Sequence, residues 1–105
     1  MTKPLFDEII HAPNRLQICA MLAAVESAEF ATIRDTLEIS DSALSKHLKV
    51  LQTARYVAAQ KTSGNAHRST WLSLTGLGRG ALAGHLAELR RITDLAADFG
   101  SRSPR

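Results

Sequence analysis

Residues 30–54 read FATIRDTLEISDSALSKHLKVLQTA, two helical patterns joined by a short polar turn. The first pattern spans Phe30–Leu37, where apolar residues recur at helical spacing. The second begins at Ser40 or Asp41, either of which can cap a helix, and continues to about Ala54. Its apolar residues lie at i, i+4 and i+7 and are Leu44, Leu48 and Leu51. A tight turn between two such helices predicts a helix-turn-helix.

The outer face of the second helix carries small residues near its amino end and lysines behind them. These residues are Ser42, Ala43, Ser45, Lys46 and Lys49. Small side chains allow close approach to base edges, and lysines pair with phosphates. The pattern therefore predicts a helix that enters a groove of double-stranded DNA, with His47 at the edge of the contact.

The charge distribution along the chain is strongly asymmetric. The 46 residues between Asp41 and Glu88 contain no acidic residue and six Lys or Arg, so a formal net charge of +3 hides a +6 middle and a −3 remainder. A basic run alone usually marks a solvated face. Here the basic segment coincides with the helix-turn-helix, which favours a surface that meets a polyanion.

A basic hairpin is predicted directly after the helix-turn-helix. Val57–Lys61 and Ser69–Leu74 have strand-like patterns, and Gly64-Asn65 between them is typical of a turn. Its basic residues, Lys61, His67 and Arg68, are expected to meet the phosphate backbone. Thr32 and Arg34, on the preceding helix, are further candidates for phosphate contacts.

Three more helices are predicted around this centre. Pro4–Ile10 forms a short one, Pro13–Val25 a buried one, and Gly76 to about Phe99 a long one capped by Thr75. Glycines weaken the first half of the long helix, so a start after Gly80 is the alternative. Residues 1–99 are then one domain, and residues 100–105 a disordered tail.

The apolar stripes of the first and last helices exceed what a small core needs, which predicts packing against a second copy. The expected dimer residues are Leu5, Phe6, Ile9, Leu82, Leu86, Leu89, Ile92 and Leu95.

Several short motifs, taken in order, resemble bacterial winged-helix transcriptional regulators. Pro13-Asn14-Arg15-Leu16 with Ile18, and the S-x-H-L-x-x-L pattern from Ser45 to Leu51, are similar to ArsR-type repressors. Thr70-Trp71, Leu74-Thr75 and Gly78 look more like MarR-like regulators. The resemblance implies a mainly α fold with a small β-hairpin in the order α-α-α-α-β-β-α. It also implies a cytoplasmic homodimer that acts, as a repressor, on a pseudo-palindromic operator.

The chain departs from these families at a few positions. Arg55 stands just past the recognition helix, where glycine is usual, and a left-handed conformation there would cost Arg about 1–2 kcal/mol. The chain is therefore expected to leave that helix differently. The Cys-x-Cys that metal-sensing relatives carry is missing from Thr32–Leu37.

Other chemistry finds little support in the sequence. No Gly-rich phosphate loop, H-E-x-x-H motif or nucleophile elbow is present, so neither an enzyme nor a cofactor is expected. His85 and Glu88 have the spacing of a metal pair, but no second pair accompanies them, so positions on the solvated surface or on the polar rim of a dimer are expected, and no metal. Lone Cys19 is interpreted as a buried small hydrophobe, with redox sensing as the alternative. No apolar run is long enough for a membrane span.

Two other functions remain open. One is a winged helix that serves as a protein-interaction or dimerisation module without DNA binding. The other is a ligand-responsive regulator whose dimer cleft holds an unidentified small hydrophobic effector. Substitution of Lys46 and Lys49 separates the first of these from a DNA-binding regulator, because only DNA binding depends on both lysines.

Overall fold

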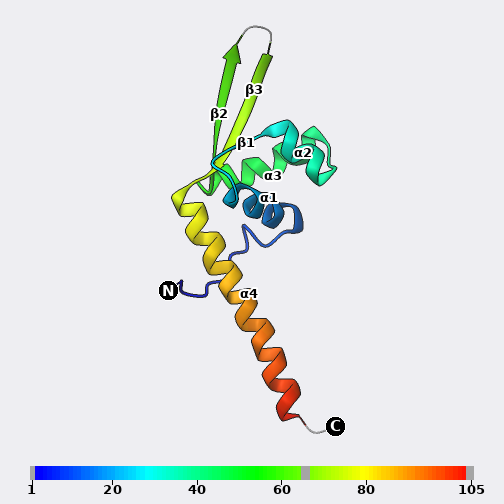
Figure 1. Cartoon of the computed structure of the whole chain (residues 1–105), viewed down its shortest axis with the longest axis vertical. Coiled ribbons are helices and arrows are strands. Elements are labelled where there is room, and N and C mark those ends of the chain that lie inside the picture. Colours follow the sequence, from blue (N-terminus) through cyan, green and yellow to red (C-terminus); the bar gives the residue numbers. More distant parts are fainter. Residues whose placement is uncertain (1, 65–66, 104–105) are drawn as a thin grey trace.

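The computed structural model describes residues 2–64 and 67–103 and contains four helices and three strands. In chain order they are α1 (Pro13–Ala23), β1 (Ala28–Glu29), α2 (Phe30–Leu37), α3 (Asp41–Thr53), β2 (Val57–Gly64), β3 (His67–Leu74) and α4 (Gly76–Arg102). Helices α1, α2 and α3 form a body from which the hairpin projects at one end and α4 at the other (Figure 1). The molecule is therefore elongated, 67 × 28 × 21 Å. This is a winged-helix fold, as predicted.

One apolar core joins α1, the helix-turn-helix, the sheet and the first half of α4. Its members are Ile10, Ile18, Cys19, Leu22, Ile33, Leu44, Leu48, Leu51, Val57, Leu72, Leu74 and Leu82. The apolar spacing of α3 is confirmed, because its three leucines are at most 4% exposed. Burial of each such side chain is worth about 2 kcal/mol, which fixes the rotation of α3 about its axis.

The predicted helix at Pro4–Ile10 is wrong. The chain from Thr2 to Asp7 is an irregular arm that lies along α4, and a turn follows at residues 8–10. The Leu5 amide donates to the Gly84 carbonyl of α4 at 2.9 Å. A helix of about seven residues repays its nucleation cost poorly, so contacts with α4 decide the conformation. Of the predicted apolar stripe, only Ile10 reaches the core.

The sheet has three strands in the order β1-β3-β2, whereas only the hairpin was predicted. Strand β1 pairs with β3 through Ala28↔Leu72 and Glu29↔Trp71. Two residues are too short to show the alternation by which a strand is recognised. The hairpin itself is longer than expected, and its outermost described pair is Gly64↔His67. The predicted turn residue Asn65 lies outside the described residues.

Helix α4 begins at Gly76, so the alternative start after Gly80 is wrong. The Thr75 hydroxyl accepts a hydrogen bond from the Gly78 amide at 2.9 Å, as predicted for the cap, and donates to the Arg55 carbonyl at 2.7 Å. This double role joins the start of α4 to the end of α3, which offsets the low helix propensity of the glycines. The other end of α4 passes Phe99 and includes Gly100–Arg102, which were expected in a disordered tail; residues 104–105 lie outside the described part.

Helices α2 and α3 end in the same way. In each, a charged residue takes the left-handed conformation, Glu38 with φ 54° and Arg55 with φ 66°. After α3, the Tyr56 amide donates to the Leu51 carbonyl and the Arg55 amide to the Gln52 carbonyl, both at 2.9 Å. These are the two bonds of a Schellman motif, usually built on glycine. The expectation that Arg55 changes the helix exit is therefore wrong, because the Schellman bonds impose the usual exit.

We expect Arg55→Gly to raise the free energy of unfolding by about 1 kcal/mol. Glycine relieves the left-handed penalty, and its greater freedom in the unfolded chain offsets part of that gain. Neighbouring Ala54 has an ordinary right-handed conformation, with φ −77° and ψ −5°. Ala54→Gly should therefore lower the free energy of unfolding by about 0.5–1 kcal/mol. Urea unfolding of the two variants gives opposite signs if the backbone of Arg55 is strained, and the same sign if it is not.

Candidate nucleic-acid interface

The amino end of α3 is fixed by its own side chains. The Ser40 hydroxyl accepts a hydrogen bond from the Ala43 amide at 3.1 Å, and Asp41 lies in the first turn, where a carboxylate opposes the helix dipole. Because the three leucines of α3 face the core, the opposite side of the helix faces outward. The outward side chains Ser42, Ser45, Lys46 and Lys49 are exposed, and Ala43 is half-buried. The outer face predicted from the sequence is therefore present in the structure.

The basic side chains of the helix-turn-helix differ in how their charge is compensated. Arg34 lies 2.9 Å from both Asp35 and Asp41. Hydrogen bonds from Asp35 and then Asp41 raise the pKa of Arg34 above its usual value. The remaining ion pair among the described residues joins Arg91 to Glu88, so Lys46 and Lys49 carry uncompensated charge. The positive charge of α3 is thus available to an external anion, whereas that of Arg34 is largely offset.

His47 lies on the side of α3 that faces α1. Its Nε2 is 3.4 Å from the Asn14 side-chain amide, and the ring is half-buried. Burial, and then the nearby charges of Arg15 and Lys46, lower the pKa of His47. The lowered pKa favours the neutral ring near pH 7 when no phosphate is bound, which weakens His47 as a cationic contact.

The wing and α3 share one hollow. A cavity of about 480 Å³ is lined by Ser45 and Gln52 of α3, by Lys61 of β2 and by Thr70 of β3. Lys61 and Thr70 are paired across the hairpin, so their side chains lie on the same face of the sheet. Arg68, two residues from Thr70, shares that face by the alternation of a strand. Lys61, Arg68 and the outer face of α3 are therefore brought together on one side of the molecule.

Thr70 and Gln52 line this hollow, although neither was predicted as a site residue. Thr70 could have been found from the hairpin register, since it pairs with Lys61. Thr32, at the start of the helix-turn-helix, is exposed and its carbonyl accepts from the Thr36 hydroxyl at 2.7 Å. The backbone of His67 belongs to β3, and its side chain lies outside the described part.

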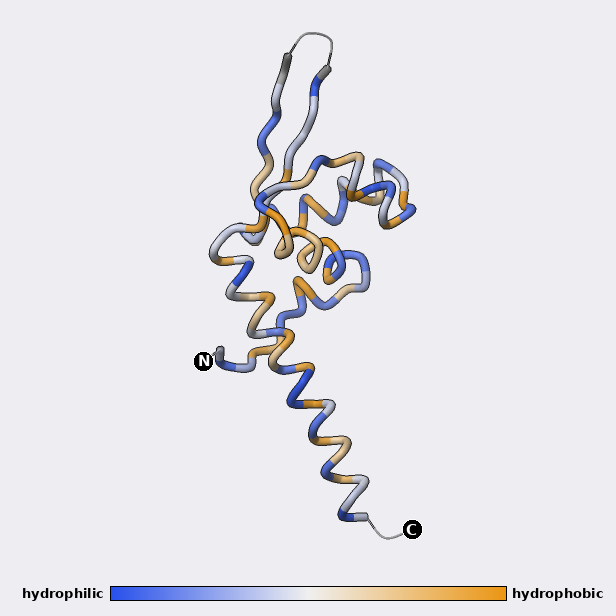
Figure 2. Tube along the Cα trace, viewed as in Figure 1, coloured by the Kyte–Doolittle hydropathy of each residue, from blue (hydrophilic) through white to orange (hydrophobic). Residues whose placement is uncertain are grey.

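The expected dimer residues separate into two groups. Leu82 is 5% exposed and belongs to the core, so it has little surface to offer a partner. Exposed apolar side chains continue from the arm to the far end of α4, at Leu5, Phe6, Ile9, Leu77, Leu86, Ile92, Leu95 and Phe99. Figure 2 shows apolar and polar residues alternating along the part of α4 that extends beyond the body. Within the described chain nothing covers this surface, which includes most of the predicted interface.

His85 and Cys19 are both buried in the body. His85 is 0% exposed, so its predicted surface position is wrong; the arm covers it. Cys19 is also 0% exposed, which confirms a buried small hydrophobe, and burial raises the pKa of its thiol to about 11. The described residues contain no group of three or more His, Cys, Asp or Glu that could hold a metal ion. None of the helices over that same span is long and apolar enough to cross a membrane.

Comparison with known proteins agrees with this geometry. A family model for a winged helix DNA-binding domain matches residues 14–93. The transcriptional regulator homologue protein from Pyrococcus horikoshii OT3 is 25% identical, with a TM-score of 0.79 over 84% of this chain and 87% of that one. For the YusO protein from Bacillus subtilis the identity is 25% and the TM-score 0.72, over 84% of this chain and 62% of that one. An uncharacterised protein from Methanocaldococcus jannaschii is 27% identical over 86 residues, 82% of this chain and 94% of its own length.

The fold is also shared with a zinc-responsive MarR family member, ZitR from Lactococcus lactis. Its identity is 23% and its TM-score 0.62, over 93% of this chain and 67% of that one. The chain belongs to the winged helix DNA-binding domain family and has the fold of MarR-like transcriptional regulators.

Proposed function

We propose that this protein is a transcriptional regulator that binds double-stranded DNA as a homodimer and represses by occluding its operator. The observation that carries the proposal is the structure of α3, whose leucine face is buried while its opposite face presents small side chains and two uncompensated lysines. A helix of this kind, held rigidly by its core, can enter a major groove. Such a role would place the protein with the DNA in the cytoplasm.

The proposed contacts follow from side-chain chemistry. Ser42, Ala43 and Ser45 are small enough for base-edge contacts near the amino end of α3. Lys46, Lys49, Lys61 and Arg68 neutralise phosphates. Thr32, His47 and His67 are secondary candidates for backbone contacts, and Arg34 contributes less because Asp35 and Asp41 already offset its charge.

The proposed dimer uses the arm and α4. Leu5 and Phe6 contact α4 at Gly84 and His85, whereas Ile9 lines a pocket with Val50 and Thr53 of α3. All three side chains are exposed in the single chain. The apolar stripe of α4 comprises Leu86, Leu89, Ile92 and Leu95. An exposed apolar surface of this extent is typical of an interface. A two-fold axis through it would present two α3 helices to successive major grooves, about 34–36 Å apart.

The test is selection of genomic fragments with the purified protein, sequencing of the bound DNA, and light scattering at micromolar concentration. We expect a dimer and one enriched pseudo-palindrome with half-sites about 10 bp apart. With about four phosphate contacts per subunit, log K should fall against log[salt] with a slope of about −7. Between 50 and 200 mM salt the affinity should therefore fall about 10⁴-fold. A monomer without enriched DNA would favour the protein-interaction module instead.

A further inference from the structure

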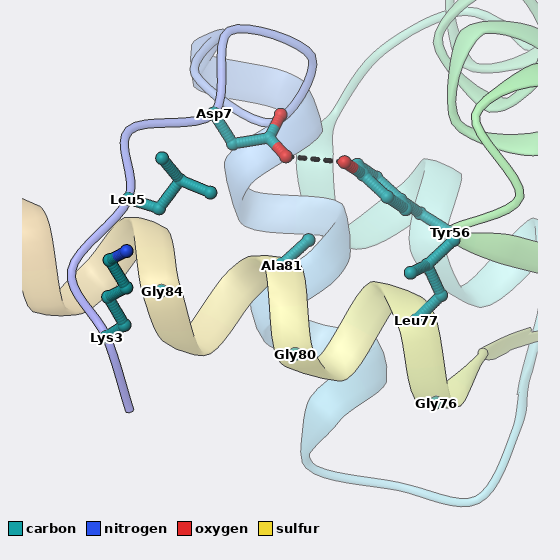
Figure 3. Close-up of a pocket in the computed structure, with 9 residues that line it drawn as sticks. All are labelled: Lys3, Leu5, Asp7, Tyr56, Gly76, Leu77, Gly80, Ala81 and Gly84. Atoms are coloured by element: carbon teal, nitrogen blue, oxygen red, sulfur yellow. Dashed lines mark hydrogen bonds between the residues drawn. The ribbon is translucent and has the colours of Figure 1, made fainter. Parts of the chain in front are cut away.

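A continuous chain of hydrogen bonds ties the amino-terminal arm to α4 and to the end of the recognition helix. The Asp7 amide donates to His85 Nδ1 at 2.9 Å, and His85 Nε2 lies 2.9 Å from His11 Nδ1. Asp7 Oδ2 accepts from the Tyr56 hydroxyl at 2.6 Å, a contact drawn in Figure 3. Tyr56 also forms the Schellman bond that ends α3. Four segments of the chain therefore meet at one small polar cluster.

The positions of the hydrogens in this cluster follow from one fixed donor. The Asp7 backbone amide is always a donor, so His85 Nδ1 must be an acceptor. Neutral His85 then carries its hydrogen on Nε2 and donates to His11 Nδ1. A proton added to His85 Nδ1 would face the Asp7 amide, and one added to His11 Nδ1 would face His85 Nε2–H. Both contacts can therefore be kept only while both rings are neutral.

Apart from these bonds, the arm is held mainly by the Phe6 ring, whose centroid lies 4.6 Å from that of His11 and 4.8 Å from that of His85. Leu5 and Phe6 are 68% and 41% exposed. A cavity of about 360 Å³ lies between the arm and α4, lined by Leu5, Asp7, Tyr56 and Ala81 among others (Figure 3). Gly84 allows the close approach, since a Cβ there would lie 3.3 Å from the Lys3 carbonyl oxygen. A segment with few buried contacts opens at low free-energy cost once its hydrogen bonds are lost.

We propose that His11 and His85 form a proton-sensitive latch, and that uptake of a proton by the pair releases residues 3–7 from α4. Ile10, buried in the core, and the Arg15 bond to the Ile9 carbonyl at 2.5 Å keep the end of the arm attached. The proposal does not depend on DNA binding. Because Leu5 and Phe6 belong to the proposed dimer surface, release of the arm would remove part of that surface and loosen the dimer in acid.

Other titratable or charged groups around the pair do not replace the lost bonds. They are Lys3 and Asp7 of the arm, Glu8 of the turn after it, Arg15 and Cys19 of α1, Tyr56 after α3, and Glu88 of α4, itself paired with Arg91. The Asp7 carboxylate favours a proton on His85, but it already accepts from Tyr56 and from the Ile10 amide at 3.0 Å. Burial, and then His11, outweigh Asp7 and lower the pKa of His85 below 6.5.

The direction of the pH effect follows from that lowered pKa. When the arm is released, the His85 ring has an ordinary pKa near 6.5. It then takes up a proton more readily than it does while the arm is latched. The latch is therefore fully stable above pH 6.5 and weakens as the pH falls toward the lower pKa of latched His85. For one proton taken up, the opening constant rises by up to about tenfold for each pH unit in that window.

Amide hydrogen exchange resolved by NMR tests the latch in the full-length protein. Protection factors for the Leu5 and Asp7 amides should fall by up to about tenfold for each pH unit below pH 6.5. The Leu48 amide in the core of α3 should stay protected. His85→Gln should remove the part of the pH dependence that comes from protonation of His85, because a glutamine amide can still accept from Asp7 and donate to His11 without titrating. His47→Gln is the matched control, since His47 also has a lowered pKa but does not contact the arm.

A second measurement needs no variant. Imidazole nitrogen spectra should show the Nε2–H tautomer for both His11 and His85 at pH 7.5, and loss of arm protection should accompany protonation of His85. The latch is overturned if His85 takes up a proton while Leu5 and Asp7 stay protected, or if the arm opens while both rings remain neutral. Retention of the full pH dependence in His85→Gln would also overturn it.

Discussion

Gly78→Ala is expected to lower the free energy of unfolding by about 3 kcal/mol. A Cβ at Gly78 would lie 2.3 Å from the Tyr56 carbonyl oxygen and 2.8 Å from Leu74 Cδ1. The Tyr56 carbonyl cannot easily move, because it accepts from the Thr75 amide at 2.9 Å where the recognition helix meets α4. The alanine must therefore push α4 away from the body.

Gly80→Ala is the matched control, on the same helix and two residues away. A Cβ at Gly80 would have nothing within 4 Å, so only helix propensity changes. Alanine should raise the free energy of unfolding by up to about 1 kcal/mol. Urea unfolding followed by circular dichroism measures both variants. Equal effects at the two positions would show that the close contact at Gly78 does not limit the packing of α4.

These two glycines show where sequence patterns stop being informative. Both lie in the same glycine-rich start of α4, and the sequence predicts the same helix weakening at each. Only the position of the Tyr56 carbonyl, 22 residues earlier in the chain, separates them. Helix α2 was predicted with its observed bounds, and α3 to within a residue, because apolar spacing and the cap at Ser40 are local signals.

The predictions that failed, for the arm, His85 and β1, depend on contacts between segments far apart in the chain. The arm has helical spacing, but its conformation is decided by α4, with which it shares a hydrogen bond across 79 residues. The burial of His85 follows from the position of the arm, so one error produced the other. Strand β1 exists only because β3 is beside it.

The part of the candidate interface that lies on α3 could be predicted because it depends on local apolar spacing. The outward residues of α3 lie on the side of the helix opposite its buried leucines, and Lys46 and Lys49 are among them. The compensation of Arg34 depends on Asp41, seven residues away across the turn, and spacing alone does not show that contact. The hollow shared by α3 and the wing depends on the hairpin register, so Thr70 escaped prediction.

A Lys46→Ala, Lys49→Ala double variant is expected to lose DNA affinity on the order of 10³-fold at 0.1 M salt. In a dimer this substitution removes four of about eight phosphate contacts, so the slope of log K against log[salt] should fall from about −7 to about −3.5. Both side chains are exposed and lie outside the ion pairs of the described chain, so folding should be unaffected. Fluorescence anisotropy with the selected operator, at four salt concentrations, gives both quantities.

The matched control is an Arg90→Ala, Arg102→Ala double variant, which removes the same charge from exposed positions on α4. Because α4 extends away from the hairpin and α3, this variant should keep a slope of about −7 (Figure 1). Equal losses in both variants would mean that net charge, rather than the face of α3, drives binding. An unchanged slope in the Lys46, Lys49 variant would remove α3 from the DNA contact altogether. Retained dimerisation in that variant would then favour a protein-interaction role for the winged helix.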